Sequence, residues 1–175
     1  MGHPDESSTT ADLPTTARGP LERWGTRAGL FLLTAVVVVA ALGFLGPRSA
    51  EVSATDGDYE LDVEYPSIIR AGQPAPLHVR VGSADGFDGP IELALCDDFF
   101  DHLDFQSWYP TPSKETGTAT ELTYEFDPPD GDVFEVSLDA RAAPGQFGGI
   151  EDCTIAVLRN GSELASVTFK SWRMP

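Results

Sequence analysis

The sequence has few basic residues. It contains 11 Lys and Arg against 28 Asp and Glu, a formal net charge of −17 at pH 7. Residues 47–175 hold 8 of the basic and 24 of the acidic side chains, a net charge of −16. Because nucleic-acid binding needs Lys and Arg to displace the counterions of phosphates, we expect no nucleic-acid partner, and repulsion from anionic lipid headgroups. The acidity suits a solvated surface outside the cell, attraction of cations, or a basic partner.

Recognisable catalytic motifs are also missing. The chain contains no G-x-S-x-G, H-E-x-x-H, P-loop or dinucleotide fingerprint, and residues 47–175 have two histidines, His78 and His102. A Ser–His–Asp triad assembled in space stays an alternative, because such triads are defined by geometry rather than by chain order. We predict that the protein is not an enzyme and has no catalytic residues, no cofactor and no metal ligands.

Cysteine is scarce, with only Cys96 and Cys153. An even number of cysteines in an oxidising compartment favours a disulfide between them. Closing the loop between them would contribute roughly 4 kcal/mol in the chain-entropy model. Two buried, unpaired thiols are the alternative, and two cysteines alone lack the four ligands of a structural zinc site.

One long apolar run is present, from Ala28 to Gly46, without a charged residue. At about 1.5 Å per helical residue it crosses a hydrocarbon layer of roughly 30 Å. We therefore predict a transmembrane helix over residues 28–46, which makes the bilayer a binding partner. Residues 1–27, rich in Pro, Ser and Thr without apolar periodicity, are predicted to be a disordered cytoplasmic tail.

Basic residues next to the run predict its orientation. One basic residue, Arg48, closely follows the run, whereas three precede it: Arg18, Arg23 and Arg27. Excess Lys and Arg stay on the cytoplasmic side, so we expect a single-pass cell-membrane protein with its N-terminus inside and its C-terminal domain outside. A cleaved signal peptide is the rival interpretation, since Val52-Ser53-Ala54 would suit a signal peptidase.

After a predicted linker at residues 47–57, apolar residues recur at every second position, which is typical of strands. Seven short runs separated by turns predict an all-β domain over residues 58–175, a seven-stranded antiparallel sandwich of immunoglobulin-like or fibronectin-like type. A true immunoglobulin domain is not expected, because Cys96 is out of phase with its run and Glu151 replaces the tyrosine of the corner motif. Asn160-Gly161 indicates a type I′ hairpin. The runs centre on 59–65, 77–81, 91–95, 122–126, 134–138, 153–157 and 167–169.

Two segments between the runs are candidate sites. Residues 97–105 have helical spacing and carry a carboxylate cluster with His102, which could hold calcium or simply face water: Asp97, Asp98, Asp101 and Asp104. Residues 106–118 are expected to form a long loop. Its Trp108 and Tyr109 are the candidate partner surface, or alternatively a plug for the open end of the sandwich.

Several segments together resemble a known group of proteins. They are 86–90 (Gly-Phe-Asp-Gly-Pro), 109–113 (Tyr-Pro-Thr-Pro-Ser), 126–132 (Phe-Asp-Pro-Pro-Asp-Gly-Asp) and 173–175 (Arg-Met-Pro). The pattern resembles uncharacterised bacterial single-pass membrane-anchored proteins with one extracytoplasmic β-sandwich domain. The resemblance implies the anchor and the sandwich, and it supplies no functional residues.

From these features we predict a membrane-anchored extracytoplasmic protein-interaction module that is not an enzyme. Its partner would be a membrane or envelope protein. The alternatives are a cation-binding or envelope-structural β-domain and, less favoured, a hydrolase.

Overall fold

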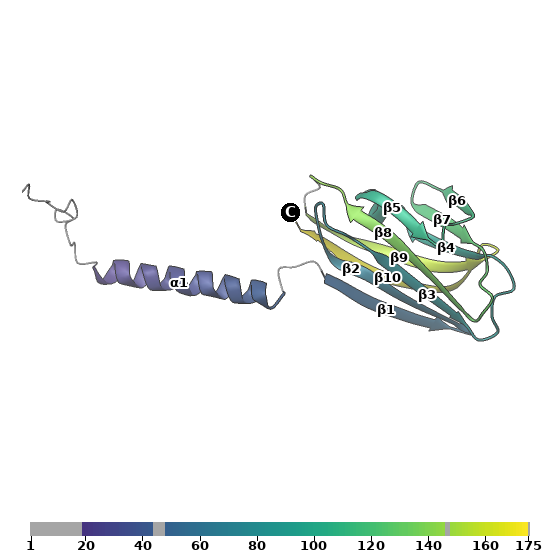
Figure 1. The fold of residues 1–175 in the computed structure, drawn as a ribbon, viewed down its shortest axis with the longest axis horizontal. Helices are drawn as coiled ribbons and strands as arrows, with labels where there is room; N and C mark the ends of the chain where they lie inside the picture. Colours follow the sequence, from purple (N-terminus) through teal and green to yellow (C-terminus); the bar gives the residue numbers. More distant parts are fainter. Residues whose placement is uncertain (1–18, 44–47, 146–147, 175) are drawn as a thin grey trace, which may run out of the picture. The chain divides into compact units, whose positions relative to one another are not determined.

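The computed structural model describes residues 19–43, 48–145 and 148–174. The chain forms two compact units, residues 1–45 and residues 46–175, which we describe separately (Figure 1). The first contains one apolar helix, and the second is mostly β. The predicted classes of secondary structure are therefore confirmed: one N-terminal apolar helix and a β-rich remainder.

The helix, α1, runs from Pro20 to Ala41. Among the described residues it is the one helix long and apolar enough to cross a membrane, over Trp24–Ala41. The hydroxyl of Thr34 donates a 2.8 Å hydrogen bond to the carbonyl of Leu30, so this polar group is satisfied within the helix. The helix starts eight residues before the predicted span, because Pro20 suits a first helical turn that needs no N–H donor. Residues 1–18 of the predicted tail and 44–46 of the predicted span lie outside the described residues.

The second unit has ten strands among the described residues, not seven. A short helix, α2 (Asp97–Phe100), follows the fourth strand. The strands are β1 (Arg48–Asp56), β2 (Tyr59–Arg70), β3 (Leu77–Ser83), β4 (Ile91–Cys96), β5 (Leu103–Tyr109), β6 (Lys114–Gly117), β7 (Glu121–Phe126), β8 (Val133–Ala142), β9 (Gly149–Arg159) and β10 (Ser162–Met174).

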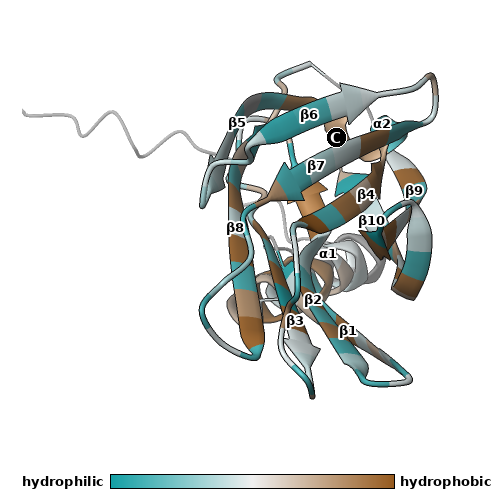
Figure 2. Cartoon of the chain, turned by 90° about the vertical axis from the view of Figure 1, so that its right-hand side faces the viewer, coloured by the Kyte–Doolittle hydropathy of each residue, from teal (hydrophilic) through white to brown (hydrophobic). Residues whose placement is uncertain are grey.

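The strands form one connected, curled sheet rather than two separate sheets. Its order is β5-β8-β3-β2-β10-β9-β4-β7-β6, with β1 paired to the other edge of β2. We call β5-β8-β3-β2 and β10-β9-β4-β7-β6 the two branches of the sheet. Figure 2 shows the two branches bending toward each other around the interior, with alternating hydrophobic and hydrophilic bands along β8. The predicted seven-stranded sandwich is thus corrected to a ten-stranded curled sheet.

Strand β2 connects the two branches. Its first half pairs antiparallel with β3 as far as Glu64, and its last three residues pair parallel with β10. Pro66 lies between these two stretches and has no N–H to donate, so the ladder with β3 does not continue through it. The buried hydroxyl of Ser171 donates a 2.7 Å hydrogen bond to the carbonyl of Pro66, so β10 is tied to β2 at the change of partner.

The core lies inside the curl and receives alternate residues from most strands, though none from β6, which is exposed at all four positions. Leu61 and Val63 of β2, Val79 of β3 and Leu93 of β4 have 1 % of their surface exposed or less. Helix α2 adds Phe99, whose ring packs edge-on against that of Phe169 at 5.9 Å. The period of two predicted this inward face correctly.

Three strands lie where the sequence predicted none. Residues 48–56 form β1 instead of a linker, and residues 103–117 form β5 and β6 instead of a helical turn followed by a loop. The small apolar residues of β1, Val52 and Ala54, give a weak pattern, and Lys114–Gly117 has no apolar residue at all. These strands form because neighbouring strands present free backbone groups, which a local pattern cannot indicate.

The predicted hairpin is confirmed. Asn160 and Gly161 join β9 to β10 with φ values of 50° and 76°. Both lie in the left-handed region that a type I′ turn requires, and Asn and Gly tolerate it best. The turn fixes the register of the longest antiparallel pair in the sheet.

Candidate functional site

A groove of about 560 Å³ lies on the outer face of β1, β2, β3, β8 and the end of β5. We call it the outer groove. Its polar side chains come from alternate strand positions that point away from the core. They are Glu51, Asp62, Glu64, His78, Arg80, Tyr109, Glu135 and Ser137.

One row of side chains crosses five strands of the groove. The pairing register places Tyr109 opposite Ser137, Ser137 opposite His78, His78 opposite Glu64, and Glu64 opposite Glu51. Directly paired residues on one face have Cβ atoms about 5 Å apart, so the row is continuous. The hydroxyl of Ser137 donates a 3.4 Å hydrogen bond to the carbonyl of Tyr109.

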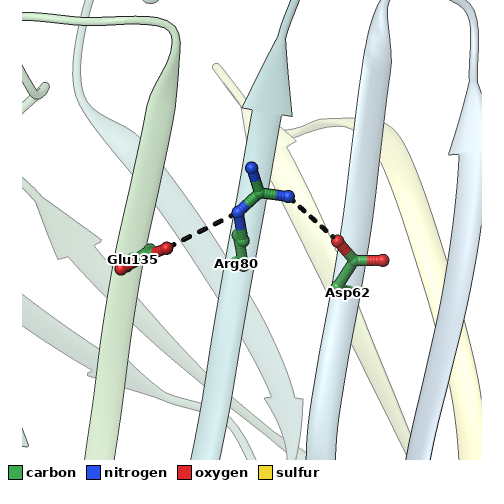
Figure 3. Close-up of polar contacts among 3 residues, drawn as sticks. All are labelled: Asp62, Arg80 and Glu135. Atoms are coloured by element: carbon green, nitrogen blue, oxygen red, sulfur yellow. Dashed lines mark hydrogen bonds and ion pairs between the residues drawn. The ribbon is translucent and has the colours of Figure 1, made fainter.

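A second row lies beside the first, with Arg80 at its centre. The Nη1 atom of Arg80 lies 3.3 Å from Oδ2 of Asp62, and its Nε lies 3.5 Å from Oε1 of Glu135 (Figure 3). Both contacts connect neighbouring strands. The side chain of Arg80 is 46 % exposed, so water screens the two ion pairs and each contributes less than about 1 kcal/mol.

The outer groove has an excess of negative charge. Four carboxylates line it, and Arg80 is the one guanidinium among its lining residues. Two of the carboxylates pair with Arg80, which leaves Glu51 and Glu64 side by side across β1 and β2. Since like charges on paired strands repel, a cationic group between them would be favourable.

The structure separates the two residues of the candidate partner surface. Trp108 points inward and contacts the rings of Tyr124 at 4.9 Å and Phe126 at 6.0 Å, so it closes the gap between β5 and β7. Tyr109 points outward, is 80 % exposed and lines the outer groove. Trp108 therefore packs against the core, and of the two residues only Tyr109 is available as an exposed surface.

The hydroxyl of Tyr124, whose ring contacts Trp108, has a raised pKa. Burial raises its pKa above the ordinary value of 10.0, and the nearby carboxylate of Glu115 raises it further. The hydroxyl donates a 3.4 Å hydrogen bond to Oε1 of Glu115. The neutral form of the hydroxyl is thus the one that suits the folded protein.

Cys96 and Cys153 form a disulfide, with their Cα atoms 5.4 Å apart. It links the end of β4 to β9 across neighbouring strands, next to α2. Glu151 lies near Cys153. Its Oε1 atom lies 2.9 Å from Nε2 of His102 and also forms an ion pair with Arg173. All three side chains of this ionic cluster are at least three-quarters buried.

The acidic segment forms no metal centre. Within the ranges that the structure describes, no group of three or more His, Cys, Asp or Glu could hold an ion. Asp97 and Asp98 lie in the first turn of α2, where acidic side chains favour the helix N-terminus, and Asp101 and Asp104 are exposed. His102 belongs to the ionic cluster with Glu151 and not to the carboxylates beside it.

Sequence reasoning missed most of the outer groove. His78, Arg80, Asp62 and Glu64 were recognised only as the polar positions of two alternating strands. Their alternation was the available signal, but it does not reveal which strands are neighbours or in which register they pair. That information comes only from the fold.

No family model matches the chain, and no curated protein matches it in sequence. Three solved structures are similar at low identity. One is AvmM, described as catalysing macrocyclization in alchivemycin A biosynthesis (12 % identity, TM-score 0.41, covering 74 % of this chain and 97 % of that one). Another is the alkylpurine DNA glycosylase AlkC of Pseudomonas fluorescens bound to DNA with an abasic site analogue (16 %, 0.33, 63 % and 28 %). The third is a family 123 glycoside hydrolase from Clostridium perfringens (12 %, 0.38, 61 % and 21 %).

These matches correct the prediction that the protein is not an enzyme. Two of the similar structures are a macrocyclase and a glycoside hydrolase. The chain spans about a quarter of the length of the glycosylase and a fifth of that of the hydrolase, and the TM-scores are low. We therefore neither exclude catalysis nor derive an activity from these structures.

Proposed function

We propose that this protein is a single-pass membrane protein that presents the outer groove of its β unit to a basic segment of a protein partner. Helix α1 supplies the anchor, because its candidate span Trp24–Ala41 has 18 residues and extends about 27 Å, close to the thickness of a hydrocarbon core. The three Arg residues before the apolar run that begins at Ala28 support a cytoplasmic N-terminus and a β unit outside the cell membrane. The disulfide supports the same side, since disulfides persist in oxidising compartments.

The outer groove is the observation that carries the proposal. It combines two carboxylates that form no ion pair with the described residues, Glu51 and Glu64, with the exposed ring of Tyr109 at the other end of the same row. A Lys or Arg of the partner would gain an ion pair at the carboxylates and a cation–π contact at the ring. A partner segment with two basic residues could therefore use both ends of the groove.

The finer architecture that we propose for the β unit is immunoglobulin-like. The branch β5-β8-β3-β2 has the order of the four-stranded sheet of that fold, and β10-β9-β4 has the order of the three-stranded opposite sheet. Connection of the branches through β2 would then be a local feature at Pro66. This architecture would leave the outer face of each branch available for binding.

Site-specific crosslinking in native membranes tests the proposed function. A photoreactive phenylalanine analogue replaces Tyr109 in the full-length protein, and a control protein carries it at exposed Thr116 on β6. We expect one partner captured from Tyr109 and not from Thr116, with a several-fold lower yield in the Glu64→Lys background because of the reversed charge. Equal capture at both positions, or a yield insensitive to Glu64→Lys, would contradict the proposal.

A second candidate function rests on one feature of the same row. Ser137, His78 and Glu64 are successive neighbours across β8, β3 and β2, an order that could serve as nucleophile, base and orienting carboxylate. A fluorophosphonate probe would test this hydrolase candidate by labelling Ser137 of the native protein but not of Ser137→Ala. Absence of labelling on the native protein would end it.

A further inference from the structure

A row of four side chains crosses neighbouring strands at one end of the β unit. Register places Arg48 of β1 opposite Ile68 of β2, Ile68 opposite Trp172 of β10, and Trp172 opposite Ile150 of β9. We call it the terminal row. Directly paired residues share a face, and the inward position beside them is taken by buried Ile69. The terminal row therefore lies on the outer face and spans about 14 Å across three strand spacings.

The terminal row exposes an unusual amount of apolar surface for this unit. Among the described residues of the β unit, the exposed large hydrophobic side chains are Tyr109, Ile150 and Trp172. Ile150 is 69 % exposed and Trp172 is 46 % exposed, and the two are direct partners in the β9–β10 ladder. Single exposed apolar residues need no explanation, but a Trp–Ile pair extended by Ile68 is a patch.

Basic and acidic side chains lie together at the same end of the unit. Arg48 begins β1, Arg70 ends β2 and Arg173 lies next to the end of β10. Arg173 is ion-paired with Glu151, which also contacts His102, and Asp152 lies 3.1 Å from Nζ of Lys170. The charges of these pairs compensate each other, which suits contact with a surface that has no net charge.

Few residues of the sequence separate this end of the β unit from the last residue of α1. Residues 42–47 separate the last residue of α1 from Arg48, and a chain of that length spans at most about 25 Å. If α1 crosses a bilayer, the terminal row is therefore the part of the β unit restricted to the neighbourhood of the lipid headgroups. Trp suits that layer, because an indole is apolar at one side and wet at the other.

We propose that the terminal row rests on the membrane, with Trp172 and Ile150 in the interfacial layer. This inference depends on anchoring by α1, as proposed above. The lipid is zwitterionic, because the net charge of −16 on residues 47–175 opposes an anionic surface. Contact with the surface would hold the β unit in one orientation and leave its opposite end furthest from the membrane.

Tryptophan quenching by brominated phosphatidylcholine tests the contact in the full-length protein. Three variants are reconstituted in ordinary vesicles and in vesicles brominated near the top of one acyl chain: Trp24→Phe, Trp172→Phe and the double variant. The double variant retains only Trp108, which stays in place in all three because it packs against the core. Subtracting its signal isolates Trp172 in the first variant and Trp24 in the second.

We expect the isolated Trp172 emission to lose roughly half its intensity in brominated vesicles, as for an indole in the interfacial layer. Quenching of Trp24 without quenching of Trp172 would overturn the contact while leaving the anchor in place. Absence of quenching at both positions would overturn the anchor and the contact together. A Trp172 buried against another protein would be shifted to shorter wavelength but not quenched, which also overturns the contact.

Discussion

At the scale of single residues, Arg80 controls the charge of the outer groove. It pairs with Asp62 and Glu135 across two strand boundaries, and both contacts are exposed to water. The role that follows is electrostatic rather than structural: the guanidinium neutralises two of the carboxylates that a basic partner would otherwise meet.

Arg80→Met should therefore leave stability nearly unchanged and strengthen partner binding. We expect the free energy of unfolding to change by less than about 1 kcal/mol, because exposed ion pairs contribute little. Urea unfolding would measure this, with Lys170→Met as a matched control on another face. The crosslinking yield from Tyr109 should rise in Arg80→Met; a fall would mean that Arg80 itself contacts an acidic partner.

Tyr124 gives a prediction at alkaline pH. Its folded-state pKa is raised by burial and by Glu115, so the folded state holds the proton more tightly than the unfolded state. The contribution to stability is fully present below the unfolded pKa of 10.0 and is lost as pH rises through the higher folded pKa.

Tyr124→Phe should remove that part of the pH dependence. As pH rises above 10.0, the unfolded-state pKa of Tyr124, the melting temperature should fall less steeply in the variant than in the native protein. Thermal unfolding over a series of alkaline buffers would measure both slopes. Tyr109→Phe, at an exposed site, is the control and should leave the decline as in the native protein. Equal slopes for native and Tyr124→Phe proteins would refute the assignment.

At the scale of elements, β4, α2 and β9 are joined by the disulfide and by aromatic packing. Cys153 is 1 % exposed, and Phe99 and Phe100 of α2 are buried beside it. The 57-residue separation of the cysteines includes α2 and four strands, so the cross-link restricts much of the unfolded chain.

Cys96→Ala with Cys153→Ala should lower the free energy of unfolding by about 4 kcal/mol, the value of a closed loop of this length in the chain-entropy model. Chemical denaturation of both proteins would measure the difference. Since the native protein has no other cysteine, reducing agent should destabilise it and leave the double variant unaffected. A double variant as stable as the native protein would show that the loop closure contributes little.

The limits of sequence prediction are clearest at this scale. All seven predicted runs are strands, because alternation such as Tyr59, Leu61 and Val63 reflects burial of one face. The strand β6, with no apolar residue, forms through pairing with β7 and has no local signal. The outer groove was missed for a related reason: Glu64 and Ser137 are 73 positions apart, and only the register of β2, β3 and β8 brings them into one row.

At the scale of the whole molecule, an apolar helix and an acidic β unit belong to one chain, and the β unit has two different candidate surfaces. We propose the outer groove for a basic partner and the terminal row for a lipid surface. Both roles require that α1 stays attached to the β unit. A chain cut after Ala54 would lose the helix together with Arg48 and most of β1.

The most direct test is the intact mass of the native protein recovered from the membrane fraction after alkaline carbonate extraction. We predict that the protein remains in the membrane pellet with a mass that includes α1. A soluble product that begins near Thr55 would contradict the account, because it would make the helix a removed signal sequence and leave the β unit without an anchor.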